Sequence, residues 1–150
     1  MFRFMIIAWI SLLLISCSTH GDTSMLSFGR SDTTTDKGMR YLLGRGVARD
    51  DKQAFYYFSR AANDGDPFAE NELAYMYAAG KGIERDYTKA LYWYQQAANH
   101  GLASAQYNLG LMYLYGLGVS PNKTLARKWF QASRAHDFEP ARDALVRLNA

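Results

Sequence analysis

The sequence has too few cysteines for a disulfide framework. Its 150 residues contain one cysteine, Cys17, so no intrachain disulfide can form. Hydrophobic residues make up 49% of the chain and charged residues 21%, which is ordinary for a globular protein. A chain of this length suits one domain.

The sequence also lacks a strong excess of either charge. Its 17 Lys and Arg residues against 14 Asp and Glu residues give a formal charge of +3. Arg3 is the single cation in the first sixteen residues, so residues 17–150 carry 16 − 14 = +2. A nucleic-acid-binding domain would show Lys and Arg clustered on one face. We therefore expect no nucleic-acid partner.

Motifs of common hydrolases are absent as well. The chain contains neither G-x-S-x-G nor H-E-x-x-H. Acid–base catalysis needs two carboxyl groups that converge on one cleft in unlike environments. Asp50 and Asp51 stand at an expected helix start, where capping explains them, and Glu70 and Glu72 diverge on a helix. We expect no catalytic residues and no enzyme activity.

Histidines give no sign of a metal site. His100 and His136 lie 36 residues apart, near the ends of two expected helices. A structural metal site needs third and fourth ligands, and none recurs beside them. Histidine is favoured near a helix C-terminus by the helix dipole. We therefore expect neither a metal nor a cofactor.

The amino terminus has the pattern of a signal peptide. Arg3 is followed by an apolar run of 11 residues from Met5 to Ile15. Such a run matches a signal-peptide core and is well short of the roughly 20 residues that span a bilayer. Residues 1–16 are thus predicted to be a signal peptide.

The end of this run, Leu14-Ile15-Ser16-Cys17, resembles the bacterial lipobox. The resemblance implies that Cys17 is lipidated and becomes the first residue after cleavage, which would anchor the protein to a membrane. Ser18 resembles the residue found in lipoproteins sorted to the outer membrane, on its periplasmic side. Residues 17–31 are therefore predicted to be the lipidated cysteine and a polar, flexible tether. The alternative is an ordinary secretory signal that leaves a soluble periplasmic protein.

The rest of the chain repeats itself. The segment from Gly80 to Gly101 recurs from Gly44 to Gly65 and again from Gly116 to Asp137. The offsets 80 − 44 and 116 − 80 are both 36 residues. A fixed period between about 20 and 50 residues indicates a stacked repeat array.

Each repeat has the signals of two helices. Asp66, Asp86 and Asn122 are suitable N-cap residues, and glycines follow the expected helix ends. The sequence predicts an all-α fold, an α/α solenoid of about three helical hairpins with a C-terminal capping helix. The repeat domain spans residues 32–150, with units at about 32–66, 67–102 and 103–138 and the cap at 139–149. The first helix of the first unit is expected to be short or frayed.

Apolar residues recur at helical spacing and predict the core. Ala74 and Gly110 are small, where paired helices must approach closely. Trp93 and Trp129, with Tyr57 one period earlier, are predicted to be large wedges between units.

Three motifs carry a resemblance to a known family. These are A-x-x-Q-Y-N-L-G-x-M-Y at Ala103–Tyr113, G-x-G-V at Gly116–Val119, and W-Y-x-x-A-A at Trp93–Ala98. They resemble the Sel-1-like repeats, relatives of the tetratricopeptide repeat, over about residues 36–149. The resemblance implies a solenoid that binds protein, with its first helices lining a concave face.

If the first helices line that face, the partner-binding residues are those that lie off the packed stripe. Tyrosine is a frequent interface residue because it is large, amphipathic and cheap to order. The alternative for Tyr107 and Tyr115 is packing between units. The predicted concave residues are Met39, Leu43, Asn71, Tyr75, Tyr107, Leu111, Leu114 and Tyr115.

The function predicted from these features is non-catalytic protein binding at the periplasmic face of a bacterial membrane. Small Sel-1-like lipoproteins resemble immunity partners of phospholipase effectors delivered by type VI secretion, so the most concrete hypothesis is an immunity protein that sequesters a secreted lipase. The alternative is an envelope scaffold or assembly adaptor. A peptidoglycan or β-lactam hydrolase is disfavoured, because the relatives linked to β-lactam binding are stapled by disulfides.

Overall fold

The computed structural model describes residues 32–149, and these residues form seven helices and no strand. The all-α fold of helical hairpins is confirmed. The predicted signal peptide, Cys17 and the tether up to residue 31 lie outside the described residues. Within the described range, no helix combines the length and the apolarity needed to cross a bilayer. The helices are α2 (Thr34–Leu43), α3 (Asp51–Asn63), α4 (Pro67–Ala79), α5 (Tyr87–Asn99), α6 (Ala103–Tyr115), α7 (Lys123–Arg134) and α8 (Glu139–Asn149).

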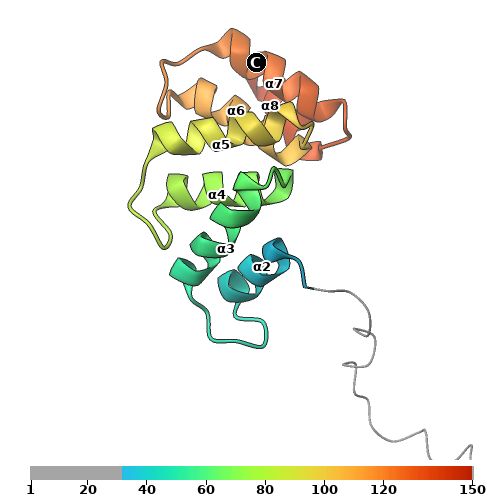
Figure 1. Ribbon diagram of the computed structural model, residues 1–150. Helices are drawn as coiled ribbons and strands as arrows, with labels where there is room; N and C mark the ends of the chain where they lie inside the picture. The colour runs from blue at the N-terminus through green and yellow to red at the C-terminus, as the bar shows by residue number, and fades with distance from the viewer. Residues whose placement is uncertain (1–31, 150) are drawn as a thin grey trace, which may run out of the picture. The chain divides into compact units, whose positions relative to one another are not determined.

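Each helix packs on the next one along the chain, so three hairpins (α2–α3, α4–α5 and α6–α7) stack in order and α8 closes the series on α7. Figure 1 shows this succession, from α2 in blue to α8 in red. The first helix α2 is short, as predicted, with 10 residues against 13 in α4. It is nevertheless well capped, because Thr33 and Asp36 form a reciprocal capping box.

Caps recur with the period of the repeat. Asp50, Asp86 and Asn122 each precede a second helix, and each side chain accepts a hydrogen bond from a backbone N–H in the first turn. These bonds satisfy donors that a helix start leaves without partners. The capping explanation given above for Asp50 is therefore confirmed.

Within each hairpin, an aromatic ring on the second helix lies against a small residue on the first. A Cβ atom added to Gly38 would lie 2.8 Å from the ring of Phe58, and one added to Gly110 would lie 2.6 Å from the ring of Phe130. The same positions in the second unit hold Ala74 and Tyr94, which share one buried cluster. The small residues Ala74 and Gly110 were predicted from the sequence, but Gly38 was not. The buried aromatic partners were not predicted either: Phe58, Tyr94 and Phe130.

The predicted wedges lie one residue before these aromatic partners along each second helix. Trp93 packs partly against the buried cluster shared by α3 and α4 and against the one shared by α4, α5 and α6, so it lies between units as predicted. Trp129 packs partly against the second of these clusters. Tyr57 was predicted to lie between units as well, and this is wrong. No described helix precedes α2, so Tyr57 stacks instead on Tyr41 of its own unit, with ring centroids 5.6 Å apart and planes within 8°.

Adjacent hairpins also meet at the turns. A Cβ atom at Gly82 would lie 2.2 Å from the carbonyl oxygen of Asp51, at the start of α3. In the next unit, a Cβ atom at Gly118 would lie 2.5 Å from the carbonyl oxygen of Tyr87, at the start of α5. Gly46 holds the same position in the first unit and has no atom within 4 Å of its added Cβ. Glycine at this position of the repeat thus permits backbone contact with the preceding unit, where the structure describes one.

This difference predicts that Gly82→Ala destabilises the domain far more than Gly46→Ala. Both glycines have positive φ, 69° and 71°, so both substitutions carry a similar backbone cost of about 1–2 kcal/mol. Only Gly82→Ala adds a steric clash, and such overpacking costs about 1–3 kcal/mol of additional stability. Urea unfolding of both variants, followed by circular dichroism, measures the difference. Equal losses in the two variants would show that the turn does not hold neighbouring units together.

Candidate functional site

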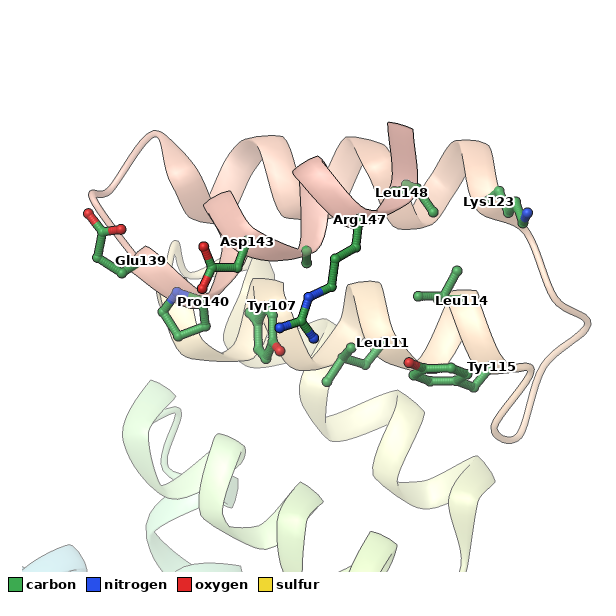
Figure 2. Close-up of a pocket in the computed structure, with 11 residues that line it drawn as sticks. Tyr107, Leu111, Leu114, Tyr115, Lys123, Glu139, Pro140, Asp143, Arg147 and Leu148 are labelled. Atoms are coloured by element: carbon green, nitrogen blue, oxygen red, sulfur yellow. The ribbon is translucent and has the colours of Figure 1, made fainter. Parts of the chain in front are cut away.

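A groove lies between α6 and α8, with a volume of about 630 Å³. One wall comes from α6, the other from α8, and the first residue of α7 closes one end. Figure 2 shows the side chains converging from the two helices. The residues that line it are Tyr107, Leu111, Leu114, Tyr115, Lys123, Glu139, Pro140, Asp143, Ala144, Arg147 and Leu148.

A contact that joins α4 and α6 has no counterpart at the groove between α6 and α8. Between α4 and α6, the amide nitrogen of Asn108 donates to the side-chain oxygen of Asn71 at 3.2 Å. One period of 36 residues later, the same two positions hold Tyr107 and Ala144. Alanine has no polar group and is too short to fill the space, so the bridge between neighbouring first helices is lost and a hollow remains.

The floor of the groove is apolar and anchored in the third core. The ring of Tyr107 lies 5.6 Å from that of Phe130 and 5.5 Å from that of Phe138, measured between centroids. Leu111 and Leu114 of α6 are partly buried against the same core, as is Leu148 of α8. Tyr115, at the end of α6, is 66% exposed. A rigid apolar floor with an exposed aromatic at one end suits contact with another protein.

Charged side chains line the rim of this floor. Glu139 and Asp143 stand near the start of α8, and Arg147 lies one turn after Asp143. Glu139 is paired with Arg142 at 3.2 Å, in an exposed ion pair. Lys123 stands at the other end of the groove, close to Leu148 and Leu114 (Figure 2). The rim is therefore acidic at one end and basic at the other.

The residues predicted for the concave face divide into two sets. The α6 residues Tyr107, Leu111, Leu114 and Tyr115 come together in the groove. Met39, Leu43, Asn71 and Tyr75 do not line it.

Those four residues have different surroundings. Met39 packs partly against the first core, and Leu43 is 48% exposed at the end of α2. Tyr75 is 39% exposed, with the ammonium group of Lys81 4.8 Å from its ring centroid. The prediction for Asn71 needs correction, because this residue is 7% exposed and its amide is used inside the domain. Helical spacing placed it off the packed stripe but did not reveal the contact between α4 and α6.

The α8 wall was not predicted from the sequence. Residues 139–149 were predicted to be a cap, although Asp143 and Arg147 lie 36 residues after Tyr107 and Leu111. Extending the repeat period by one more unit would have placed them on the same face. The signal was present in the spacing, but the change from apolar to charged residues concealed it.

Two carboxyl groups on α4 are withdrawn from solvent to different degrees, Glu70 being buried and Glu72 half-buried. The side chain of Glu70 is 4% exposed, and its Oε2 lies 2.9 Å from Nδ1 of His100, which is 46% exposed. Glu72 accepts a hydrogen bond from the side-chain amide of Asn71 at 3.0 Å. Burial raises the pKa of Glu72, whereas the Asn71 bond and the positive charge of Lys81 act in the opposite direction. Burial also raises the pKa of Tyr94, with a smaller effect from Glu72.

Within residues 32–149, no three His, Cys, Asp or Glu side chains gather as metal ligands would.

Comparison with known proteins identifies the repeat. The model of the Sel1 repeat matches residues 38–66, 67–102 and 103–137. The chain belongs to the Sel1 repeat family. Sel1 repeat proteins are protein-interaction modules, and the three matched repeats cover α3 to α7 and most of α2. The α8 wall of the groove lies beyond the last matched repeat.

Solved structures of other Sel1-like proteins share this fold. A Sel1 repeat protein from Oxalobacter formigenes is 38% identical, with a TM-score of 0.69 over 75% of this chain and 84% of that one. A protective antigen of uropathogenic Escherichia coli strains, which displays an SLR fold, is 34% identical, with a TM-score of 0.71. That match covers 75% of this chain and 24% of the antigen.

Cysteine-rich protein B of Helicobacter pylori is 24% identical, with a TM-score of 0.64 over 75% of this chain and 89% of that one, and it shares the fold alone. No curated protein matches the sequence.

The half-buried position of Glu72 predicts a stability effect that depends on pH. Because the folded-state pKa of Glu72 is raised, the wild-type protein loses stability as the pH rises from the ordinary pKa of glutamate through the folded-state pKa. Glu72→Gln cannot ionise, and its amide oxygen can still accept the bond from Asn71. We expect equal stability below about pH 4 and a higher unfolding temperature for the variant at pH 7.

Thermal unfolding by circular dichroism at both pH values tests this expectation. Glu84→Gln, at an exposed loop position, is the control for a general change of net charge. A variant that gains nothing at pH 7, or that gains equally at both pH values, would contradict the assigned cost of burying the carboxylate.

Proposed function

We propose that this Sel1 repeat protein is a non-catalytic binding module whose α6–α8 groove captures a partner protein. The observation that carries the proposal is the apolar floor of Tyr107, Leu111, Leu114 and Leu148, open to solvent and bounded by charged residues. Partner proteins commonly insert apolar or aromatic side chains into such pockets. The module needs no cofactor, metal or nucleic acid for this role.

The proposed location is the periplasmic face of the bacterial outer membrane. The support is the apolar run before Cys17 and the lipobox-like residues Leu14 to Cys17. Several acyl chains on Cys17 would hold the protein at the membrane, with residues 18–31 as a polar tether. If the cysteine is not lipidated, the same signal delivers the domain to the periplasm as a soluble protein.

The proposed partner is a toxic effector of the phospholipase type, which makes the protein an immunity protein. Sequestration needs a shaped surface and no bond-making, and a membrane-held groove would meet such an effector where it acts. A scaffold or assembly role in the cell envelope would use the same groove with a different partner.

The immunity role is tested by expressing the effector encoded beside this protein in the periplasm of a sensitive strain. We expect killing without this protein and survival with it. Unchanged killing in its presence would eliminate the immunity role and leave the scaffold role.

The groove itself is tested by Ala144→Phe, which fills the hollow without removing any other lining group. We expect affinity for the captured partner to fall by at least tenfold, or about 1.4 kcal/mol, with helicity unchanged. Ala135→Phe makes the same substitution at an exposed position on the end of α7, away from the groove, and should bind normally. Isothermal titration calorimetry gives both affinities. Equal binding by the two variants would place the partner on another face.

A further inference from the structure

Arg147 occupies a position that is uncharged in every preceding unit. Moving back along α8, α6, α4 and α2 in steps of 36 residues gives Arg147, Leu111, Tyr75 and Met39. The repeat therefore places a guanidinium group where the other first helices present a large uncharged side chain. Figure 2 shows this group reaching down from α8 toward Tyr107 and Leu111, over the floor of the groove.

Arg147 has no ion-pair partner within residues 32–149. Asp143 lies four residues earlier on the same helix, at a spacing and in an order that favour a helix ion pair. The pair has not formed, and Asp143 also lacks an ion-pair partner in the described part of the chain. Both charges are thus available to a molecule in the groove.

We infer that the groove takes a protein segment that presents a carboxylate to Arg147 between apolar side chains. A guanidinium binds a carboxylate through two parallel hydrogen bonds, and such charge-assisted bonds are stronger than neutral ones. The apolar neighbours of that carboxylate would rest on Leu111 and Leu114. This inference rests on the proposed binding function and adds the chemistry of the partner.

The remaining charges set the direction of the bound segment. Lys123 adds positive charge at the end of the groove near Leu114, whereas Asp143 and Glu139 add negative charge at the other end. A second acidic residue of the segment would be attracted toward Lys123 and repelled from Asp143. Complementary charge at an interface contributes mainly to specificity and orientation. The segment is therefore expected to be acidic toward Lys123 and neutral or basic toward Asp143.

The test is selection of displayed random 12-residue peptides on the immobilised full chain. Wild-type protein is expected to enrich peptides with Asp or Glu between apolar residues. Arg147→Glu should reverse the preference, so that Lys or Arg is enriched at the same position. Arg134→Glu makes the same charge change on α7, outside the groove, and should keep the wild-type preference. In a selected peptide, replacing the acidic residue by its amide should lower the affinity for the wild-type protein about tenfold. The same peptide change should not lower the affinity for Arg147→Glu.

The outcomes separate this inference from the proposed function. Peptides that lose binding to Ala144→Phe but show no acidic preference would overturn the carboxylate inference and leave the groove as the binding site. An acidic preference that persists in Arg147→Glu would also overturn it. If the wild-type protein enriches no peptide that Ala144→Phe rejects, the proposed groove function fails together with the inference.

Discussion

The close contact between an aromatic ring on each second helix and a small residue on its first helix determines the rest of the structure. A side chain of any size at Gly38 or Gly110 would occupy the space of the facing phenylalanine ring. This contact therefore fixes the distance between the two helices of a hairpin. Because the contact recurs every 36 residues, successive hairpins have similar geometry and can stack on one another. The glycines at the turns then allow adjacent hairpins to touch through their backbones.

Much of this arrangement could be predicted from the sequence, because repetition multiplies weak local signals. One capping residue or one glycine predicts little, but Asp50, Asp86 and Asn122 at equal spacing predict three helix starts. What could not be predicted depends on neighbours in space. Tyr57 has the position of a wedge but no preceding described unit to pack against. Asn71 has the position of a surface residue but forms a bridge to Asn108 of the next first helix.

Of the candidate site, the α6 wall could be predicted from the repeat and the α8 wall could not. Tyr107 and Leu111 belong to a complete repeat, so their face of the helix could be read from its period. Asp143 and Arg147 belong to α8, the last helix of the described residues, and the apolar pattern is broken there. Spacing alone places these residues beside α6, whereas the hollow between the helices depends on the absence of a bridging side chain at Ala144. The missing bridge at Ala144 can be recognised only after the structure has shown that Asn108 forms one in the preceding unit.

The positions that build the stack cannot also distinguish one partner from another, because their size and polarity are fixed by packing. Specificity must come from positions where the residue differs from the repeat pattern. Several such residues lie on α8, in one wall of the groove. Ala141 and Leu145 of this wall are buried, and Leu145 shares the third core with Ala126 and Phe130 of α7. The width of the groove therefore depends on the α7–α8 contact, while its chemistry depends on Ala144 and Arg147. The helix that packs on the third hairpin thus also supplies the features that a binding partner could recognise.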